Sequence, residues 1–167
     1  SGRENTVLGP NLAAVEPRPL LAGMAFEDVE RGDRLLVVHT SPPALSRVDT
    51  SLDEEGRPFV EVLDTVALCG NPNLLALDQR GQGPRLAFVS CYGDDAIAVV
   101  DLGLFVVVAT IAVGQGPNEL SIDPQRDWLL VANTVESSIS LIELSPSSPD
   151  YLREFATLGL GTPTRPE

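Results

Sequence analysis

The sequence contains no lysine, one histidine and only two cysteines. All eleven basic residues are arginines, and 24 acidic residues give the chain a formal net charge of −13. Such a chain repels the phosphates of nucleic acids, so we expect no nucleic-acid partner. The acidic excess reflects either general surface composition or a face for cations or basic partners. Because no run of 18 apolar residues is present, we also expect no membrane span.

Groups that carry catalysis are nearly absent. His39 is the only histidine, so any mechanism that pairs a nucleophile with a histidine base depends on this one residue. The sequence has no phosphate-binding Gly-x-x-x-x-Gly-Lys motif, no dinucleotide-binding Gly-x-Gly-x-x-Gly motif after a strand, and no Cys-x-x-Cys-His motif for covalent haem. We therefore expect neither catalytic residues nor a cofactor in this chain.

The sequence does contain an internal repeat, and a fixed period decides the architecture. Pro72 and Asp78 recur 45 positions later as Pro117 and Asp123. Three further alignments extend the repeat: Arg85–Ser90 on Trp128–Asn133, Ile97–Leu102 on Ile139–Leu144, and, at an offset of 94, Asp33–His39 on Asp127–Asn133.

Each copy consists of short apolar or alternating runs separated by turn-forming residues, which is typical of an antiparallel meander. In the last copy these runs are 119–123, 128–133 and 139–144. A fourth run, 105–114, is echoed by 155–161 and more loosely by 59–70. The prolines of 41–44 cannot donate ladder hydrogen bonds, so we place them in a loop. Four strands in about 45 residues is the size of one propeller blade.

Several motifs carry a resemblance to a known family. They are Gly-x-x-Pro at 114–117, Leu-Leu-Val-Ala-Asn at 129–133, Ile-Ser-Leu-Ile-Glu-Leu at 139–144 and Val-Val-Ala-Thr-Ile-Ala-Val-Gly at 107–114. Together they resemble the YVTN-type β-propeller repeat, over roughly residues 19–161 and most clearly over 69–144. The resemblance implies an all-β fold with three four-stranded antiparallel blades of a larger ring, for which we expect seven blades.

The predicted organisation follows from this repeat. Residues 1–17 are a linker or the tail of a preceding blade, and residues 18–167 are a propeller segment with blades at approximately 19–68, 69–113 and 114–161. Known propellers need four to eight blades to close. We therefore expect the remaining blades to come from the same protein or from a second polypeptide.

The two cysteines occupy neighbouring loops around the expected middle blade. Cys69 precedes its inner strand and Cys91 ends the antiparallel second strand, so both reach the same end of one hairpin. This position predicts a disulfide, which would place the protein outside the cytoplasm, in the periplasm, on the cell surface or in the medium. The alternatives are two unrelated buried thiols and a metal bound without a nearby histidine.

Polar residues at the same end of the blades are candidates for binding a ligand. They are Asn71, Asn73, Tyr92, Asp94, Asp95, Asn118, Asn133 and Glu136. For the adjacent acids Asp94 and Asp95, turn chemistry and solubility are the alternative. His39 stands at the strand end where the other copies have Ser90 and Asn133, and a polar cap explains it without chemistry.

An acidic turn at 49–56 is the one candidate cation site. Asp49, Asp53 and Glu55 could supply oxygen ligands. No acid stands at the twelfth position of an EF-hand loop counted from Asp49 or Ser51. We therefore interpret the turn as a solvated surface loop, with a cation site as the alternative.

Two functional hypotheses remain. The first is a non-enzymatic extracytoplasmic scaffold that binds a protein or a small ligand on the face carrying the inter-blade loops. The alternative is a propeller subunit of a periplasmic oxidoreductase whose catalytic residues or cofactor lie outside this chain.

Overall fold

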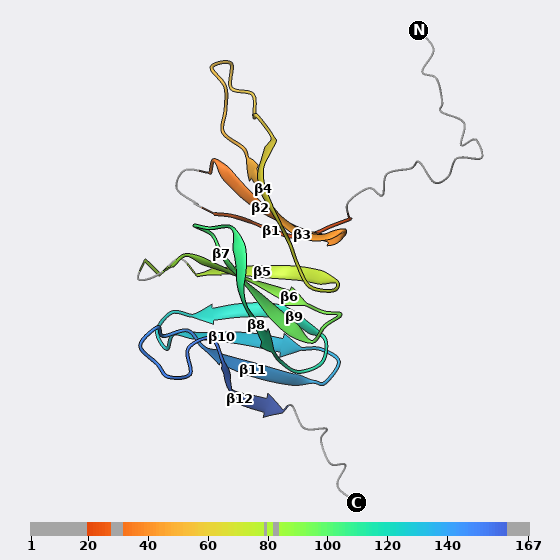
Figure 1. Ribbon diagram of the computed structural model, residues 1–167, viewed down its shortest axis with the longest axis vertical. Coiled ribbons are helices and arrows are strands. Elements are labelled where there is room, and N and C mark those ends of the chain that lie inside the picture. Colours follow the sequence, from red (N-terminus) through yellow and green to blue (C-terminus); the bar gives the residue numbers. More distant parts are fainter. Residues whose placement is uncertain (1–19, 28–31, 79, 82–83, 160–167) are drawn as a thin grey trace, which may run out of the picture.

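The computed structural model describes residues 20–27, 32–78, 80–81 and 84–159, and the predicted linker or tail at 1–17 lies outside them (Figure 1). The described residues form twelve β-strands in three four-stranded antiparallel sheets and contain no helix. In this part of the chain, therefore, no helix could cross a membrane. The predicted all-β fold with three four-stranded blades is confirmed.

Each sheet is one blade whose strands follow one another in sequence and in space. Blade 1 contains β1 (Leu20–Phe26), β2 (Arg34–Ser41), β3 (Pro43–Asp49) and β4 (Glu61–Ala67). Blade 2 contains β5 (Pro72–Asp78), β6 (Leu86–Cys91), β7 (Ala96–Asp101) and β8 (Val106–Ala112). Blade 3 contains β9 (Pro117–Asp123), β10 (Trp128–Asn133), β11 (Ser138–Glu143) and β12 (Glu154–Gly159). The three blades stack along the longest axis of the molecule (Figure 1).

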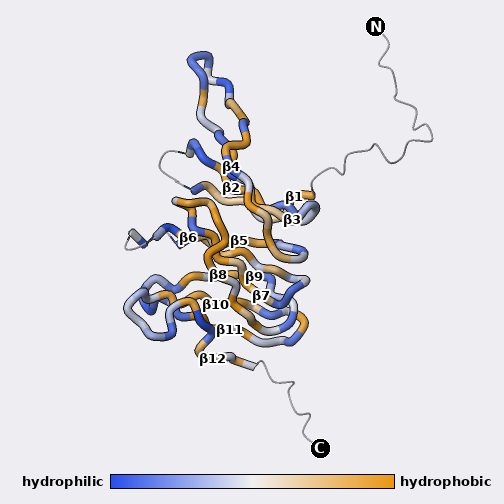
Figure 2. The backbone as a smooth tube through the Cα atoms, in the orientation of Figure 1, coloured by the Kyte–Doolittle hydropathy of each residue, from blue (hydrophilic) through white to orange (hydrophobic). Residues whose placement is uncertain are grey.

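Burial along the strands follows from this stacking. Every residue of β6, in the middle blade, is buried, because blade 2 has a neighbour on each side. The corresponding strand β10 alternates between partly buried and buried residues, because only one face of blade 3 is covered. The apolar segments accordingly concentrate in the strands (Figure 2).

Two apolar clusters join the blades. One lies between blades 1 and 2, and its buried members include Leu36, Leu45, Val89 and Val100. The other lies between blades 2 and 3 and includes Phe88, Ile97, Leu129 and Ile142. Stacked repeats bury their faces only against neighbours, so these clusters are the main source of cohesion between blades.

The inner strands of blades 1 and 2 approach each other closely at Gly23. A Cβ atom at this glycine would lie 2.8 Å from the carbonyl oxygen of Asn73 and 3.1 Å from the Cα atom of Leu74. Since both atoms belong to backbone, they cannot move aside like a flexible side chain, and the close approach requires glycine.

The strand register corrects the aligned repeat by one residue. Leu86 pairs with Asp78 and Asp101, just as Trp128 pairs with Asp123 and Glu143. Trp128 is therefore equivalent to Leu86 and not to Arg85. The reason for the error is that β6 is apolar on both faces, so its sequence has no alternation to fix the register.

The same register makes three different side chains equivalent. His39, Cys91 and Asn133 each pair with the start of the inner strand on one side and the start of the third strand on the other. Asn133 is thus equivalent to Cys91 and not to Ser90.

The loop predicted at the proline pair after β2 is a turn of one residue, so the prediction holds for Pro42 and is wrong for Pro43. Only Pro42 separates β2 from β3, and Pro43 begins β3 opposite Thr40. Pro43 lacks an N–H group, but the first residue of a strand need not donate a hydrogen bond. Its carbonyl oxygen still pairs, accepting from the N–H of Leu68 at 3.1 Å.

Candidate functional site

The eight predicted ligand residues lie at one end of blades 2 and 3, which we call the loop face. Here the second strand turns into the third, through residues 92–95 in blade 2 and 134–137 in blade 3. The chain also enters each inner strand at this end, through residues 68–71 and 113–116. Antiparallel pairing brings both kinds of connection together.

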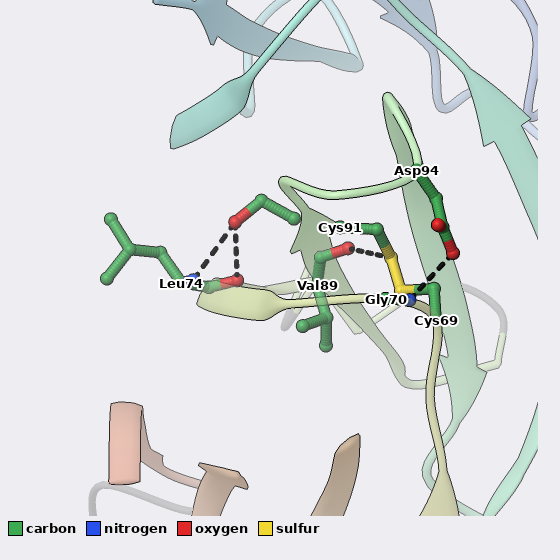
Figure 3. The surroundings of a disulfide bond; sticks show 7 residues. Cys69, Gly70, Leu74, Val89, Cys91 and Asp94 are labelled. Atoms are coloured by element: carbon green, nitrogen blue, oxygen red, sulfur yellow. Dashed lines mark hydrogen bonds between the residues drawn. A yellow bond between two sulfur atoms is a disulfide. The ribbon is translucent and has the colours of Figure 1, made fainter. Parts of the chain in front are cut away.

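Cys69 and Cys91 form the predicted disulfide, with their Cα atoms 5.7 Å apart (Figure 3). The bridge joins the loop before β5 to the last residue of β6. Cys91 is fully buried in the cluster between blades 1 and 2. The bridge therefore fixes the loop face of blade 2 to the core.

Hydrogen bonds hold the two loops of blade 2 together around the bridge. The N–H groups of Tyr92 and Gly93 donate to the carbonyl oxygens of Asn71 and Gly70, both at 3.1 Å. The Asp94 carboxylate accepts from the Gly70 N–H at 2.6 Å (Figure 3). Asn71 has a φ of 50°, which turns the chain into β5. We call this set of hydrogen bonds the clasp.

Blade 3 has an equivalent clasp. The N–H groups of Thr134 and Val135 donate to the carbonyl oxygens of Gly116 and Gln115 at 2.9 and 3.2 Å. The Glu136 carboxylate accepts from the Gln115 N–H at 2.9 Å, as Asp94 does in blade 2. Gly116, at the place of Asn71, has a φ of 67°. Two blades thus reach one loop conformation with different side chains.

Asp95 connects the two clasps across the blade boundary. Its Oδ1 atom accepts from the N–H of Gly116 at 2.9 Å, and its carbonyl oxygen accepts from the N–H of Val113 at 3.0 Å. On the loop face, the three carboxylates predicted to bind a ligand therefore have backbone N–H partners. They belong to Asp94, Asp95 and Glu136. Their role in this structure is to shape the loops.

Asn133 is 1% exposed and lies beneath the clasp of blade 3. Its Nδ2 atom donates to the hydroxyl oxygens of Ser138 and Ser140 at 3.0 and 2.9 Å. Its Oδ1 atom has no hydrogen-bond partner among the described residues. A Cβ atom at Gly114 would lie 2.5 Å from Asn133 Nδ2, so the loop passes directly over the amide.

Asn73 and Asn118 occupy the second positions of β5 and β9. Asn73 Nδ2 donates to Asn118 Oδ1 at 2.6 Å. This bond links two inner strands across a blade boundary, and the amides remain partly exposed.

Tyr92 and Val135 are the large side chains that the clasps leave exposed. Tyr92 is 38% and Val135 59% exposed. They lie on either side of Gly116, where a Cβ atom would be 3.2 Å from Tyr92 Cε2 and 2.5 Å from Val135 Cγ2. The sequence predicted Tyr92 but not Val135, because a lone valine in a turn carries no signal until the register places it beside Tyr92.

The candidate cation ligands at 49–56 do not converge. The Arg57 guanidinium binds Asp53 Oδ2 at 2.9 Å and Glu55 Oε2 at 3.1 Å. The backbone N–H of Arg57 holds the pKa of Asp53 below its ordinary value, and hydrogen bonds from Ser51 lower that of Asp49. No cluster of three or more His, Cys, Asp or Glu residues suited to a metal occurs in the described part of the chain.

His39, the candidate polar cap, lies in β2. Its Nε2 atom is buried and has no hydrogen-bond partner among the described residues.

The opposite end of the blades carries a recurring arginine latch that the sequence analysis missed. Arg47 Nε of blade 1 donates to Glu27 Oε2 at 2.7 Å, and its Nη2 donates to the carbonyl oxygen of Leu102 in blade 2. The guanidinium also lies 4.4 Å from the ring centroid of Phe105. An acid at the end of the inner strand thus holds an arginine on the next blade.

Arg80 forms the second latch, from blade 2 to blade 3. Its Nε donates to Asp78 Oδ1 at 2.7 Å and its Nη2 to the carbonyl oxygen of Leu144 at 3.3 Å, and it forms an ion pair with Asp127. Burial raises the pKa of Asp78, but the hydrogen bonds from Arg80 outweigh it and leave the pKa below its ordinary value. The recurring acid at the inner-strand end was the available sequence signal.

No family model and no curated protein matches this chain. Solved structures do. A putative 6-phosphogluconolactonase from Bacteroides uniformis matches 92% of this chain and 45% of its own, with a TM-score of 0.69 at 16% identity. The periplasmic gluconolactonase of Pseudomonas aeruginosa matches 83% of this chain and 39% of its own, with a TM-score of 0.64 at 19% identity.

A third structure is the dihydro-heme d1 dehydrogenase NirN, matched over 84% of this chain and 28% of that one, with a TM-score of 0.66 at 15% identity. Identities this low show the fold alone, and the fold is that of a β-propeller. The chain spans less than half the length of these structures.

Proposed function

We propose that this chain supplies three consecutive blades of an extracytoplasmic β-propeller of the YVTN repeat type, and that its loop face binds a protein or a small ligand. The observation that carries the proposal is the exposure of Tyr92 and Val135 on two loops whose backbones are already held by clasps. A preformed loop loses little conformational freedom on binding, so its exposed side chains contribute most of their contact energy to affinity.

The disulfide supports the extracytoplasmic part of the proposal. Such a bond persists only in oxidising compartments. Alkylation of the protein in denaturant without reductant, as isolated from its native cell, should modify no cysteine. Two modified cysteines would remove the main reason for this localisation.

Incomplete coverage of the similar structures supports the expectation of further blades. The chain matches 45% or less of each of the three structures described above. We propose that the remaining blades complete a ring of seven. The intact mass of the native protein, compared with 17.8 kDa for these residues, tests the point.

Binding through the loop face can be tested by selecting peptides from a phage-displayed library on the oxidised protein. Enriched peptides should lose at least about tenfold in affinity for the Tyr92→Ala/Val135→Ser variant, because burial of a tyrosine ring and a valine is worth more than 1.4 kcal/mol. Leu104→Ser is the matched control, since Leu104 is exposed at the opposite end of blade 2. Equal binding to all three proteins would contradict the proposal.

The oxidoreductase alternative is tested separately. A visible absorption spectrum of the native full-length protein would show a haem or quinone band if the propeller carries a redox cofactor. The likeness to NirN concerns the fold alone, so it does not favour this alternative over the binding scaffold.

A further inference from the structure

The two ends of the blades differ in the charge that they carry. The chain contains no lysine, so arginine is its strongly basic residue. The connections that form the loop face, 68–71, 92–95, 113–116 and 134–137, contain no basic residue. Every arginine of the described residues lies in or near a connection at the opposite end of the blades. These arginines are Arg34, Arg47, Arg57, Arg80, Arg85, Arg126 and Arg153.

At the end opposite the loop face, carboxylates pair with guanidinium groups of the same chain. Asp78 binds Arg80 and Asp123 binds Arg126, each with 2.6 Å between nitrogen and oxygen. Opposite charges at this distance offset much of each other's field. A cationic partner would have to compete there with an arginine that is already in place.

The carboxylates that shape the loop face keep their charge. Asp94, Asp95 and Glu136 accept from backbone N–H groups, and none of them forms an ion pair with an arginine of the described residues. An N–H group satisfies a carboxylate oxygen but carries no net charge. Each of these bonds also uses one oxygen of the carboxylate, so the negative charge and the second oxygen remain for a partner.

The buried amide beneath the clasp of blade 3 adds to the negative field of the loop face. Its Oδ1 atom, on the fully buried Asn133, is an acceptor without a partner among the described residues. The amide and the Glu136 carboxylate flank one point, because a Cβ atom at Gly114 would lie 2.5 Å from Asn133 Nδ2 and 2.4 Å from Glu136 Oε2. An unsatisfied acceptor dipole next to a carboxylate favours a cation above the loop.

The negative charges are spread over two loops and not gathered around one point. Asp94 and Asp95 belong to blade 2 and Glu136 to blade 3, and no group of three or more His, Cys, Asp or Glu residues in the described part of the chain is placed to hold a metal ion. The same two turns carry the exposed side chains of Tyr92 and Val135. A metal ion needs converging ligands, whereas a chain with several positive charges on apolar stems suits a mixed surface of this kind.

We propose that the loop face binds a basic segment of a partner protein. The apolar stems of its arginine or lysine side chains lie on Tyr92 and Val135, and their charged ends lie at the three carboxylates. This inference rests on the proposed function and names the chemistry of its partner. Charge complementarity selects the occupant, because a segment rich in acids or phosphates would be repelled. The Tyr92 ring adds a face on which a cation is attracted.

The experiment uses the peptides that the phage-displayed selection enriches on the oxidised protein. They should contain more arginine and lysine than the unselected library, and less aspartate and glutamate. Their affinity for Asp94→Asn/Glu136→Gln should fall at least about threefold at low salt, which is the effect of losing two exposed ion pairs. Asp101→Asn is the matched control. The Asp101 carboxylate also accepts from backbone N–H groups, those of Gly103 and Leu104 at 2.7 and 2.9 Å, but at the opposite end of blade 2.

Salt dependence separates a loss of charge from a loss of loop shape. The substituted amides retain an oxygen that can accept from the clasp N–H groups. Raising NaCl from about 50 mM to about 500 mM screens exposed charges, so the affinities of the unaltered protein and the double variant should converge. A variant that stays equally weaker at high salt would have lost its loop shape, which would contradict the proposal. Circular dichroism and the intact disulfide report the folding of every variant.

Three further results would overturn the proposal: enriched peptides without an excess of basic residues, equal affinity for the unaltered and the doubly substituted protein at low salt, or displacement of the peptides by calcium at a concentration equal to that of the protein. If such peptides still lose affinity for Tyr92→Ala/Val135→Ser, the loop face binds a partner of another chemistry and the proposed function stands. If no peptide is enriched, or if that variant binds as well as the unaltered protein, both proposals fail.

Discussion

Blades 2 and 3 hold the same loop conformation by different means. In blade 2 the disulfide joins Cys69 to Cys91, whereas in blade 3 Gly114 and Asn133 stand at these two places. Asn133 instead binds Ser138 and Ser140, whose equivalents in blade 2 are alanines, Ala96 and Ala98. One blade thus combines a bridge with apolar neighbours, and the other combines an amide with hydroxyl partners.

In these two blades the shape of the loop and its stability have different physical causes. The clasp hydrogen bonds and the positive φ angle recur in both blades, so the bridge is not needed to set the conformation. A disulfide acts mainly by restricting the unfolded chain, whereas the buried amide acts through partners in the folded state. Substitution of the cysteines in blade 2 and of Asn133 in blade 3 should therefore change the free energy of unfolding by different amounts.

Loss of the bridge should have the largest effect. The Cys69→Ala/Cys91→Ala variant should retain the fold and lose roughly 3 kcal/mol in the free energy of unfolding, the chain-entropy value for a loop of this size with a sequence separation of 22. Urea unfolding of both proteins in the absence of reductant measures the difference. A loss of the loop conformation itself, seen as changed amide chemical shifts at residues 92–95, would show that the clasp alone does not shape it.

Removal of the buried amide in blade 3 should rank second. Asn133→Ala leaves two buried hydroxyls without their shared donor, at a cost of about 2 kcal/mol in the free energy of unfolding. Asn118→Ala is the control, because that amide is partly exposed and water can replace its partner. If the two substitutions cost the same, burial of Asn133 is not what makes the network important.

The clasp carboxylates should distinguish the blades more finely. Glu136→Gln weakens the bond to Gln115 in a loop with no covalent support, and we expect a loss of about 1 kcal/mol. Asp94→Asn should cost about half as much, since the bridge at Cys69 holds the neighbouring Gly70 in place. Hydrogen exchange of the Gly70 amide in Asp94→Asn and of the Gln115 amide in Glu136→Gln measures the two losses. Faster exchange at Gly70 than at Gln115 would contradict the expectation that the bridge supports the clasp of blade 2.

Lowering the pH should have the smallest effect on the free energy of unfolding. The disulfide does not titrate, whereas Asp78 does. Because the pKa of Asp78 is lower in the folded chain, its ion pair with Arg80 stabilises the fold at pH values above the pKa of the unfolded chain. This contribution is lost as the pH falls through the folded-state value. Asp78→Asn should therefore flatten the decline in unfolding free energy between neutral pH and about pH 3. An unchanged slope would mean that other carboxylates account for it.

The sequence carried more information about the fold than about the site. The period of 45 and the positions of Cys69 and Cys91 depend only on chain topology, so the blades and the bridge could be predicted. The partners of Asp94 and Glu136 could not, because they depend on the positive φ angles at Asn71 and Gly116. Asparagine and glycine tolerate this conformation but also adopt others, so their presence in a loop does not fix its course. Polar residues at loop tips therefore suggested ligands where the structure has backbone caps.

The turn after the second strand has the same length in blades 1 and 2 but a different chemistry. Residues 40–43 of blade 1 occupy the place of 92–95, because His39 pairs with Ala44 as Cys91 pairs with Ala96. Pro43 is therefore equivalent to Asp95, and its carbonyl oxygen accepts from the N–H of Leu68 as that of Asp95 accepts from the N–H of Val113. A proline has no carboxylate, so blade 1 offers the loop before β5 no equivalent of the bond from Gly116 to Asp95. The loop without this carboxylate from the preceding blade is the one that the disulfide ties to its own blade.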